Sequence, residues 1–179
     1  KQIISILLTL GLLSCSNNQT KENTTEIPPK EIKQKELNDF ELISDFEKNT
    51  STFDSDTFNL MNHSTEGGEL IMFHSNEKDY LVLDFWLYGE TGKLNTTYWT
   101  DHDIKLKIVK RTEYDYVRPA PDYKITQTTQ TTQYYSYSDS TFKVFDQEKT
   151  LIQDSSNLKQ KEEIEEFFTE LTKDIKLIK

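Results

Sequence analysis

The centre of the chain alternates apolar and polar residues in segments that are joined by very short polar turns. These segments cover residues 70–74, 80–88, 94–100 and 104–117, and they are rich in β-branched and aromatic residues. Such short connections join antiparallel neighbours, because two parallel strands need a long crossover between them. This pattern restricts the fold to an antiparallel β-meander.

The same alternation predicts how the sheet is covered. Side chains two residues apart lie on one face of a strand. The second segment places four apolar residues on one face, and the fourth segment repeats this with three more: Leu81, Leu83, Phe85 and Leu87, then Ile104, Leu106 and Ile108. We therefore expect one apolar sheet face that other elements must cover.

Two segments with helical periodicity flank the meander and are expected to supply that cover. Apolar residues recur at mostly helical spacing in residues 30–49, and again from Ile164 towards the end of the chain. The later segment is an amphipathic helix for which Ser155 or Ser156 would be the N-cap. Residues 53–58 fit either a short strand or a connection, and residues 122–137 and 142–152 resume the meander.

The predicted fold class is therefore α+β. We expect an antiparallel β-meander sheet of about five to seven strands. The C-terminal amphipathic helix and an N-terminal helix would lie on one face of this sheet.

The N-terminal segment predicts where the protein is located in the cell. Residues 3–14 carry no charge and end at Cys15, which is the only cysteine. The apolar run is shorter than the roughly 20 residues of a membrane-spanning helix, so a signal peptide fits it better. Leu12, Ser14 and Cys15 resemble the lipobox of bacterial lipoproteins. This resemblance implies cleavage before Cys15 and a lipid on its thiol.

These features divide the chain into three expected parts. Residues 1–14 would be a lipoprotein signal peptide, residues 15–35 the lipidated cysteine with a flexible polar tether, and residues 36–179 a single α+β domain. The expected location is the bacterial cell envelope, as a lipid-anchored protein of the outer membrane on its periplasmic or surface face. An ordinary secretory signal with an incidental cysteine, or a cytosolic protein with an apolar first helix, are the alternatives.

The charge of the chain limits its partners. It has 31 acidic residues against 21 Lys and Arg, a net charge of −10. Such a chain repels phosphate backbones, so we expect no nucleic-acid partner. A partner attracted by charge would be basic.

Three motifs resemble a family of small, uncharacterised bacterial envelope lipoproteins. They are STEGGE at residues 64–69, GET at residues 89–91 and Y-x-Y-x-RP at residues 114–119. The resemblance covers residues 64–152, and the Thr/Gln repeat near residues 126–133 departs from it. It implies an antiparallel meander and an exported location, and it implies no activity.

Reactive side chains do not form a recognisable catalytic or metal-binding motif. His63, His74 and His102 lack the spacing of zinc ligands, and residues 54–65 lack the glycine and glutamate of a calcium-binding loop. There is also no G-x-S-x-G motif. We therefore predict no catalytic residue, no metal and no cofactor. An envelope hydrolase, with residues 101–103 in a cleft, is one alternative.

Tyrosines supply the candidate binding surface. Six of the nine lie between residues 114 and 137, and two arginines border them. Tyrosine is enriched in binding interfaces because it presents a large, rigid area with a polar tip, although cross-strand aromatic pairs also stabilise sheets. The predicted surface consists of Tyr114, Tyr116, Arg118, Tyr123, Tyr135, Tyr137 and Arg111.

The predicted function follows from the expected envelope location and from the candidate tyrosine surface. We expect a lipid-anchored, non-catalytic envelope protein whose partners are the membrane, through its anchor, and a protein or a glycan. An inhibitor of a secreted hydrolase such as lysozyme is the second alternative, because an acidic domain complements a basic enzyme.

Overall fold

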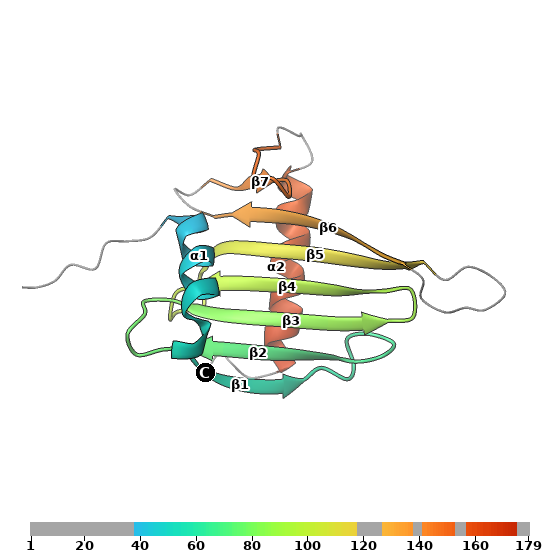
Figure 1. The fold of residues 1–179 in the computed structure, drawn as a ribbon, viewed down its shortest axis with the longest axis horizontal. Coiled ribbons are helices and arrows are strands. Elements are labelled where there is room, and N and C mark those ends of the chain that lie inside the picture. Colours follow the sequence, from blue (N-terminus) through green and yellow to red (C-terminus); the bar gives the residue numbers. More distant parts are fainter. Residues whose placement is uncertain (1–37, 118–126, 138–140, 153–156, 175–179) are drawn as a thin grey trace, which may run out of the picture. The chain divides into compact units, whose positions relative to one another are not determined.

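The described residues form one antiparallel sheet with a helix on each side (Figure 1). The computed structural model describes residues 38–117, 127–137, 141–152 and 157–174, all within the compact unit Glu36–Lys179. The elements are α1 (Asp39–Asn49), a 3₁₀ turn (Thr50–Thr52), β1 (Asp54–Asn59), β2 (Gly68–His74), β3 (Leu81–Gly89), β4 (Gly92–Thr100), β5 (Leu106–Val117), β6 (Gln127–Ser136), β7 (Lys143–Phe145) and α2 (Asn157–Asp174).

The seven strands follow one another in the order of the sequence, each antiparallel to the next. The predicted α+β class and β-meander are therefore confirmed, and the ambiguous segment 53–58 belongs to strand β1 from Asp54 onward. The predicted capping serines Ser155 and Ser156 lie outside the described residues. At the other helix, Asn38 and Glu41 form a capping box, in which each side chain accepts a hydrogen bond from the other's backbone N–H at 3.0 Å.

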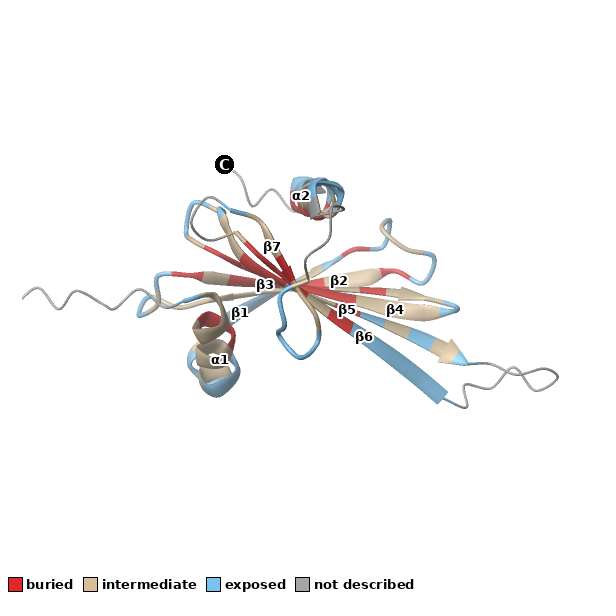
Figure 2. Ribbon diagram, turned by 90° about the horizontal axis from the view of Figure 1, so that it is seen from above, coloured by how far each residue is buried: buried red, intermediate tan, exposed pale blue. Residues whose placement is uncertain are grey.

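The two helices lie against opposite faces of the sheet (Figure 2). Leu42 and Ile43 of α1 belong to one buried cluster with Val82 and Trp99, which lie on β3 and β4. The residues next to these two, Leu83 and Tyr98, belong to the second cluster together with Ile164, Phe168 and Leu171 of α2. Consecutive strand residues point to opposite faces, so each helix has its own face.

The prediction that both helices cover the same face is therefore wrong. The alternation from Leu81 to Leu87 identified the face that α2 covers, but one end of the sheet is apolar on both faces. Pairs of consecutive buried residues such as Tyr98–Trp99 and Ile108–Val109 carry this signal. Because both faces are apolar at this end of the sheet, each is covered by its own helix.

A bulge between β4 and β5 corrects a second expectation. Trp99 lies opposite Ile108, whereas the next residue, Thr100, lies opposite Leu106, so Lys107 is an extra residue in β5. The bulge sends Leu106 to the α2 face and Ile108 to the α1 face. The prediction that Ile104, Leu106 and Ile108 share one face fails for Ile108, because an extra residue inverts the alternation.

Aromatic rings attach α1 to its end of the sheet. Phe46 packs edge-on against Phe73 and Trp99, with ring centroids 5.0 and 6.1 Å apart. One and a half turns earlier, Phe40 packs edge-on against Tyr134 and Phe145 at 5.5 and 5.1 Å. Such pairs add about 0.5–1.5 kcal/mol each beyond the burial of their area. Helix α1 thus spans from β2 to β7 near one end of the sheet.

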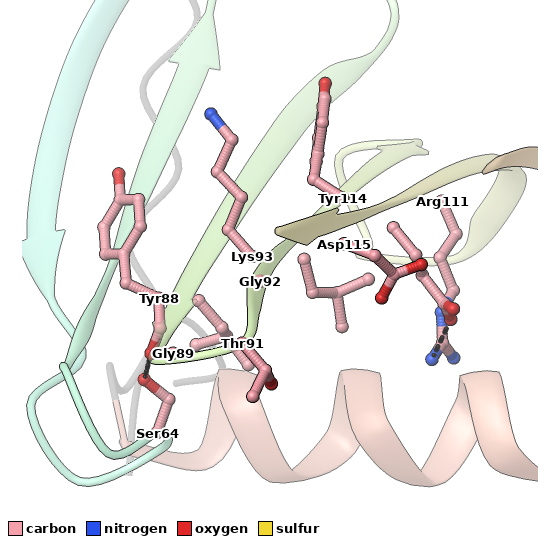
Figure 3. Close-up of a pocket in the computed structure, with 12 residues that line it drawn as sticks. Ser64, Tyr88, Gly89, Thr91, Gly92, Lys93, Arg111, Tyr114 and Asp115 are labelled. Carbon is pink, nitrogen blue, oxygen red and sulfur yellow. Dashed lines mark hydrogen bonds and ion pairs between the residues drawn. The ribbon is translucent and has the colours of Figure 1, made fainter. Parts of the chain in front are cut away.

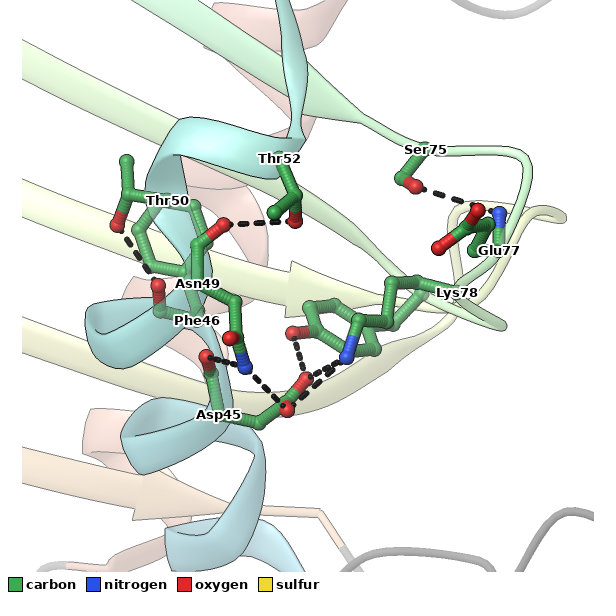
Figure 4. A network of polar contacts seen from close by, with 9 residues as sticks. Asp45, Phe46, Asn49, Thr50, Thr52, Ser75, Glu77 and Lys78 are labelled. Carbon is green, nitrogen blue, oxygen red and sulfur yellow. Dashed lines mark hydrogen bonds and ion pairs between the residues drawn. The ribbon is translucent and has the colours of Figure 1, made fainter.

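A carboxylate of α1 gives this contact a polar anchor (Figure 4). Asp45 accepts hydrogen bonds from the Lys78 ammonium at 2.7 Å, the Tyr80 hydroxyl at 2.6 Å and the Asn49 amide at 2.9 Å. Burial alone would raise the pKa of Asp45, but the hydrogen bonds from Lys78 and Tyr80 and the charge of Lys78 outweigh it. Its pKa therefore lies below the ordinary 3.8.

Replacing this carboxylate should weaken the fold in a pH-dependent way. A pKa that is lower in the folded state gives stability that is complete above the unfolded pKa and lost as the pH falls through the folded pKa. We expect Asp45→Asn to lower the free energy of unfolding at neutral pH by about 1–3 kcal/mol. Urea unfolding at neutral pH and near pH 3 measures this, and the difference from the parent should shrink at the lower pH. Asp103→Asn, at an exposed carboxylate, is the control; an equal loss there would contradict the assignment.

Candidate ligand-binding surface

Helix α1 covers only one end of its sheet face, and no other described helix or strand covers the rest of this face (Figures 1 and 2). Strand alternation continues the face from Val82, Trp99 and Ile108, which lie under α1, along β3, β4 and β5. We call the uncovered part the open face. Its residues on β2 to β5 include Glu69, Ile71, Asp84, Trp86, Tyr88, Lys93, Asn95, Thr97, Thr112, Tyr114 and Tyr116.

Three aromatic rings form a row across the open face. The Trp86 ring lies nearly parallel to those of Tyr88 and Tyr114, with centroids 6.5 and 6.0 Å away. Lys93 of β4 lies opposite both tyrosines in the strand register, and its Nζ is 4.6 Å from the Trp86 centroid and 4.7 Å from that of Tyr114. All three aromatic residues are half-buried. The row therefore joins three strands through a cation and aromatic rings.

Asp84 fixes the central ring of this row. One of its carboxylate oxygens accepts a hydrogen bond from the Trp86 indole N–H at 2.9 Å. The other accepts from the Asn95 amide at 2.8 Å and from the Thr97 hydroxyl at 2.7 Å. Because both acceptors of Asp84 are used within the sheet, the indole is held in one orientation before any ligand arrives.

The Tyr88 hydroxyl is held in a similar way. It donates to a carboxylate oxygen of Glu69 on β2 at 2.7 Å. Burial and this hydrogen bond raise the pKa of Tyr88 to about 12. The phenol thus stays protonated at physiological pH, and the row is anchored at its β2 side.

The turns at this end of the sheet shape two shallow pockets, one on either side of Tyr88. One pocket is lined by residues that include Lys93, Arg111 and Tyr114, and the other by residues that include Met61 and Glu69. Figure 3 shows Tyr88, Lys93 and Tyr114 rising from one side of the strands, while Ser64 and Arg111 lie on the side of α2. The Ser64 hydroxyl donates to the Tyr88 carbonyl and so holds the neighbouring loop against β3.

The predicted tyrosine surface does not form as one patch. Tyr114 and Tyr116 lie on the open face, opposite Gln130 and Thr128 of β6. Tyr135 lies on the α2 face, where it is 3% exposed and donates to the Gln133 amide oxygen at 2.8 Å. Tyr137 packs against the same buried cluster. β5 pairs with β6, but the register separates the two tyrosine pairs along the strands and between the two faces.

Of the other predicted site residues, only Arg111 belongs to the described part of the chain, and it lies apart from the open face. Arg111 is on the α2 face and pairs with Glu113 at 2.8 Å. Arg118 and Tyr123 lie outside the described residues, as does Cys15.

The polar residues considered for catalysis contact the backbone of their own turn or of the neighbouring β2–β3 connection. One Asp101 oxygen accepts from the backbone N–H groups of Asp103 and Lys105, both at 2.9 Å. His102 Nε2 lies 3.1 Å from the Lys78 carbonyl oxygen. In the part of the chain that the structure describes, no three His, Cys, Asp or Glu side chains gather in a group suited to a metal ion.

Sequence reasoning missed the centre of the open face. Asp84, Trp86 and Tyr88 alternate with the apolar residues Leu83, Phe85 and Leu87, and this placed them on the face for which no covering helix was predicted. The available signal was that Asp84, Trp86 and Tyr88 place two large aromatic residues and an acid on the same face of one strand. Lys93 gave no signal, because its partner Tyr114 is distant in the sequence and is brought near only by the pairing of β4 with β5.

Comparison with known proteins gives no guide to the ligand. No protein-family model matches the chain, and neither the curated proteins nor the solved structures contain a significant match. The function must therefore be argued from the geometry of the open face.

Gly92 permits the close approach of β4 and β5 beside Lys93 and Tyr114. A Cβ at Gly92 would lie 2.1 Å from the Tyr114 carbonyl oxygen, whereas one at Gly89, its partner across the hairpin, would meet nothing closer than 3.4 Å. We expect Gly92→Ala to lower the free energy of unfolding by about 1–3 kcal/mol. Gly89→Ala should change it by no more than about 0.5 kcal/mol. Denaturant unfolding of both variants checks this, and equal effects would refute the described β4–β5 contact.

Proposed function

We propose that this chain is a non-catalytic binding module of a bacterial cell envelope, and that it recognises a protein or a glycan with the open face. The observation that carries the proposal is the row of Tyr88, Trp86 and Tyr114 with Lys93, on the half of the face that α1 leaves uncovered. Aromatic residues with polar tips are enriched where proteins bind their partners.

The polar contacts around the row favour this function over a purely structural one. Asp84 orients the indole of Trp86, and Glu69 orients the phenol of Tyr88. A surface whose side chains are already ordered loses less conformational entropy when a ligand binds. The row is therefore suited to tight and selective contact.

Charge narrows the class of ligand. The open face carries Glu69 and Asp84 beside Lys93, on a chain with a net charge of −10. Strongly anionic ligands are repelled, whereas a neutral glycan or a basic protein segment is compatible with this field. Asn95 and Thr97 are buried and donate to Asp84, so a ligand would contact the aromatic rings and the Lys93 ammonium.

The proposal is tested by capture from native envelope extract and by binding to a glycan array. The bait is the full chain, beside a variant with Trp86→Ser and Tyr114→Ser and a control with Leu158→Ser at an exposed position on α2. We expect the parent and the control to bind the same ligand and the double variant to bind about tenfold to a hundredfold more weakly. Circular dichroism shows whether the double variant is folded. A folded double variant that binds as well as the parent would place the site elsewhere.

The envelope location rests on Cys15 and on the apolar run before it. We propose a lipid on Cys15 that anchors the protein to the outer membrane. No helix among the described residues is long and apolar enough to cross a membrane.

Loss of the anchor should change where the protein is found. We expect Cys15→Ala to move the protein from the membrane fraction to the soluble fraction, because stable anchoring requires the acyl chains. Fractionation with Cys15→Ala beside Ser16→Ala measures this. Retention of the Cys15→Ala protein in membranes, equal to that of Ser16→Ala, would contradict lipid anchoring.

A further inference from the structure

Strand β6 has a long exposed edge. It pairs with β5 along its whole length, from Gln127 opposite Val117 to Ser136 opposite Ile108. On its other side, β7 pairs only with residues 134–136. Every residue from Gln127 to Thr131 is exposed. Among the described strands, none pairs with this part of β6 on its outer side.

Hydrogen-bonding groups of this edge point away from the sheet. The Tyr137 N–H donates to the Lys107 carbonyl at 2.9 Å, so the odd-numbered residues here bond towards β5. In an antiparallel ladder, the alternate residues direct their N–H and C=O groups the other way. Thr128 and Gln130 therefore present backbone donors and acceptors outward.

The composition of this edge differs from that of a protected one. Natural proteins shield edge strands with charges, prolines or short length. β1, at the opposite edge of the sheet, carries Asp54 and Asp56. β6 contains neither a charged residue nor a proline, although charged residues make up 29% of the chain. The edge is thus well suited to pair with another strand.

The sequence of β6 indicates which strand that is. Residues 127–133 read Gln-Thr-Thr-Gln-Thr-Thr-Gln, the same in both directions about Gln130. In an antiparallel pair centred on Gln130, each residue faces one of its own kind in a second copy. Gln130 faces the partner's Gln130, and Thr129 faces the partner's Thr131. Thr–Thr pairs across strands are favourable, and no like charges oppose each other.

We propose that two copies of this chain pair through the outer edge of β6, antiparallel and symmetric about Gln130. Such pairing has its twofold axis perpendicular to the sheet, as in other isologous dimers. Both copies then direct the same face to the same side. The two open faces would therefore lie side by side on one continuous sheet. This inference does not depend on the nature of the ligand.

Charge-swap variants of Gln130 test the proposal. The full chain carrying Cys15→Ser, which removes the only thiol, is studied by sedimentation velocity at rising concentration. Gln130→Glu and Gln130→Lys each place like charges across the axis, so each should weaken the dimer by about fivefold or more. An equimolar mixture of the two variants should restore it, because opposite charges then face each other. Thr57→Glu, on the opposite edge, is the matched control and should leave the dimer unchanged.

The outcomes separate this interface from any other. A parent that stays monomeric into the high-micromolar range overturns the proposal. A dimer that neither Gln130 variant weakens is formed by a different surface and overturns it as well. Weakening by both variants without recovery in the mixture would show that Gln130 does not face its own copy, and it would overturn the proposed register. The proposal is supported only if both single variants weaken the dimer and the equimolar mixture restores it.

Discussion

The packing of α1 against one end of the sheet is the constraint on which the other features depend. Phe40 and Phe46 insert their rings over the strands, and Asp45 between them binds Lys78 and Tyr80. The helix is only 11 residues long, which gives it a length of about 16 Å. It lies across the strands and not along them, so it covers one end of its face and leaves the other uncovered (Figure 1).

The open face is stabilised by hydrogen bonds and ring contacts between its own side chains, and not by a covering helix. Where α1 covers the sheet, its residues are apolar, as Val82, Trp99 and Ile108 show. Beyond the helix the same face changes to Asp84, Trp86 and Lys93, whose hydrogen bonds and ring contacts connect β3, β4 and β5. A surface of this kind is ordered and partly apolar while still accessible. We regard this combination as the reason why the open face is the best candidate for ligand binding.

Much of the fold, and little of the candidate site, could be predicted from the sequence. The strands and their order follow from period-2 alternation and short turns, because both act between near neighbours in the chain. The second helix likewise follows from the spacing of Ile164, Phe168 and Leu171. The envelope location that was inferred from the N-terminal segment stays a prediction, since Cys15 lies outside the described residues.

The predictions of which residues share a face failed where the pairing of strands distant in the sequence decides the face. The register of β5 with β6 sets Tyr114 opposite Gln130 and Tyr135 opposite Val109, which divides the tyrosines between two faces. The bulge at Lys107 turns Ile108 towards α1. Neither feature has a local signature in the sequence. Trp86 could have been singled out, however, because a tryptophan on the polar side of an alternating strand requires an explanation.

The most direct test of the account uses the two tryptophans of the chain, which lie at opposite ends of the same sheet face. Trp99 is 2% exposed beneath α1, and Trp86 is half-buried on the open face. Nitrogen-15 labelling of tryptophan gives one indole N–H signal for each, and these are followed by NMR while the captured envelope ligand is added. The account predicts that the Trp86 signal shifts with saturation and that the Trp99 signal stays unchanged. Binding that leaves the Trp86 signal in place would contradict it.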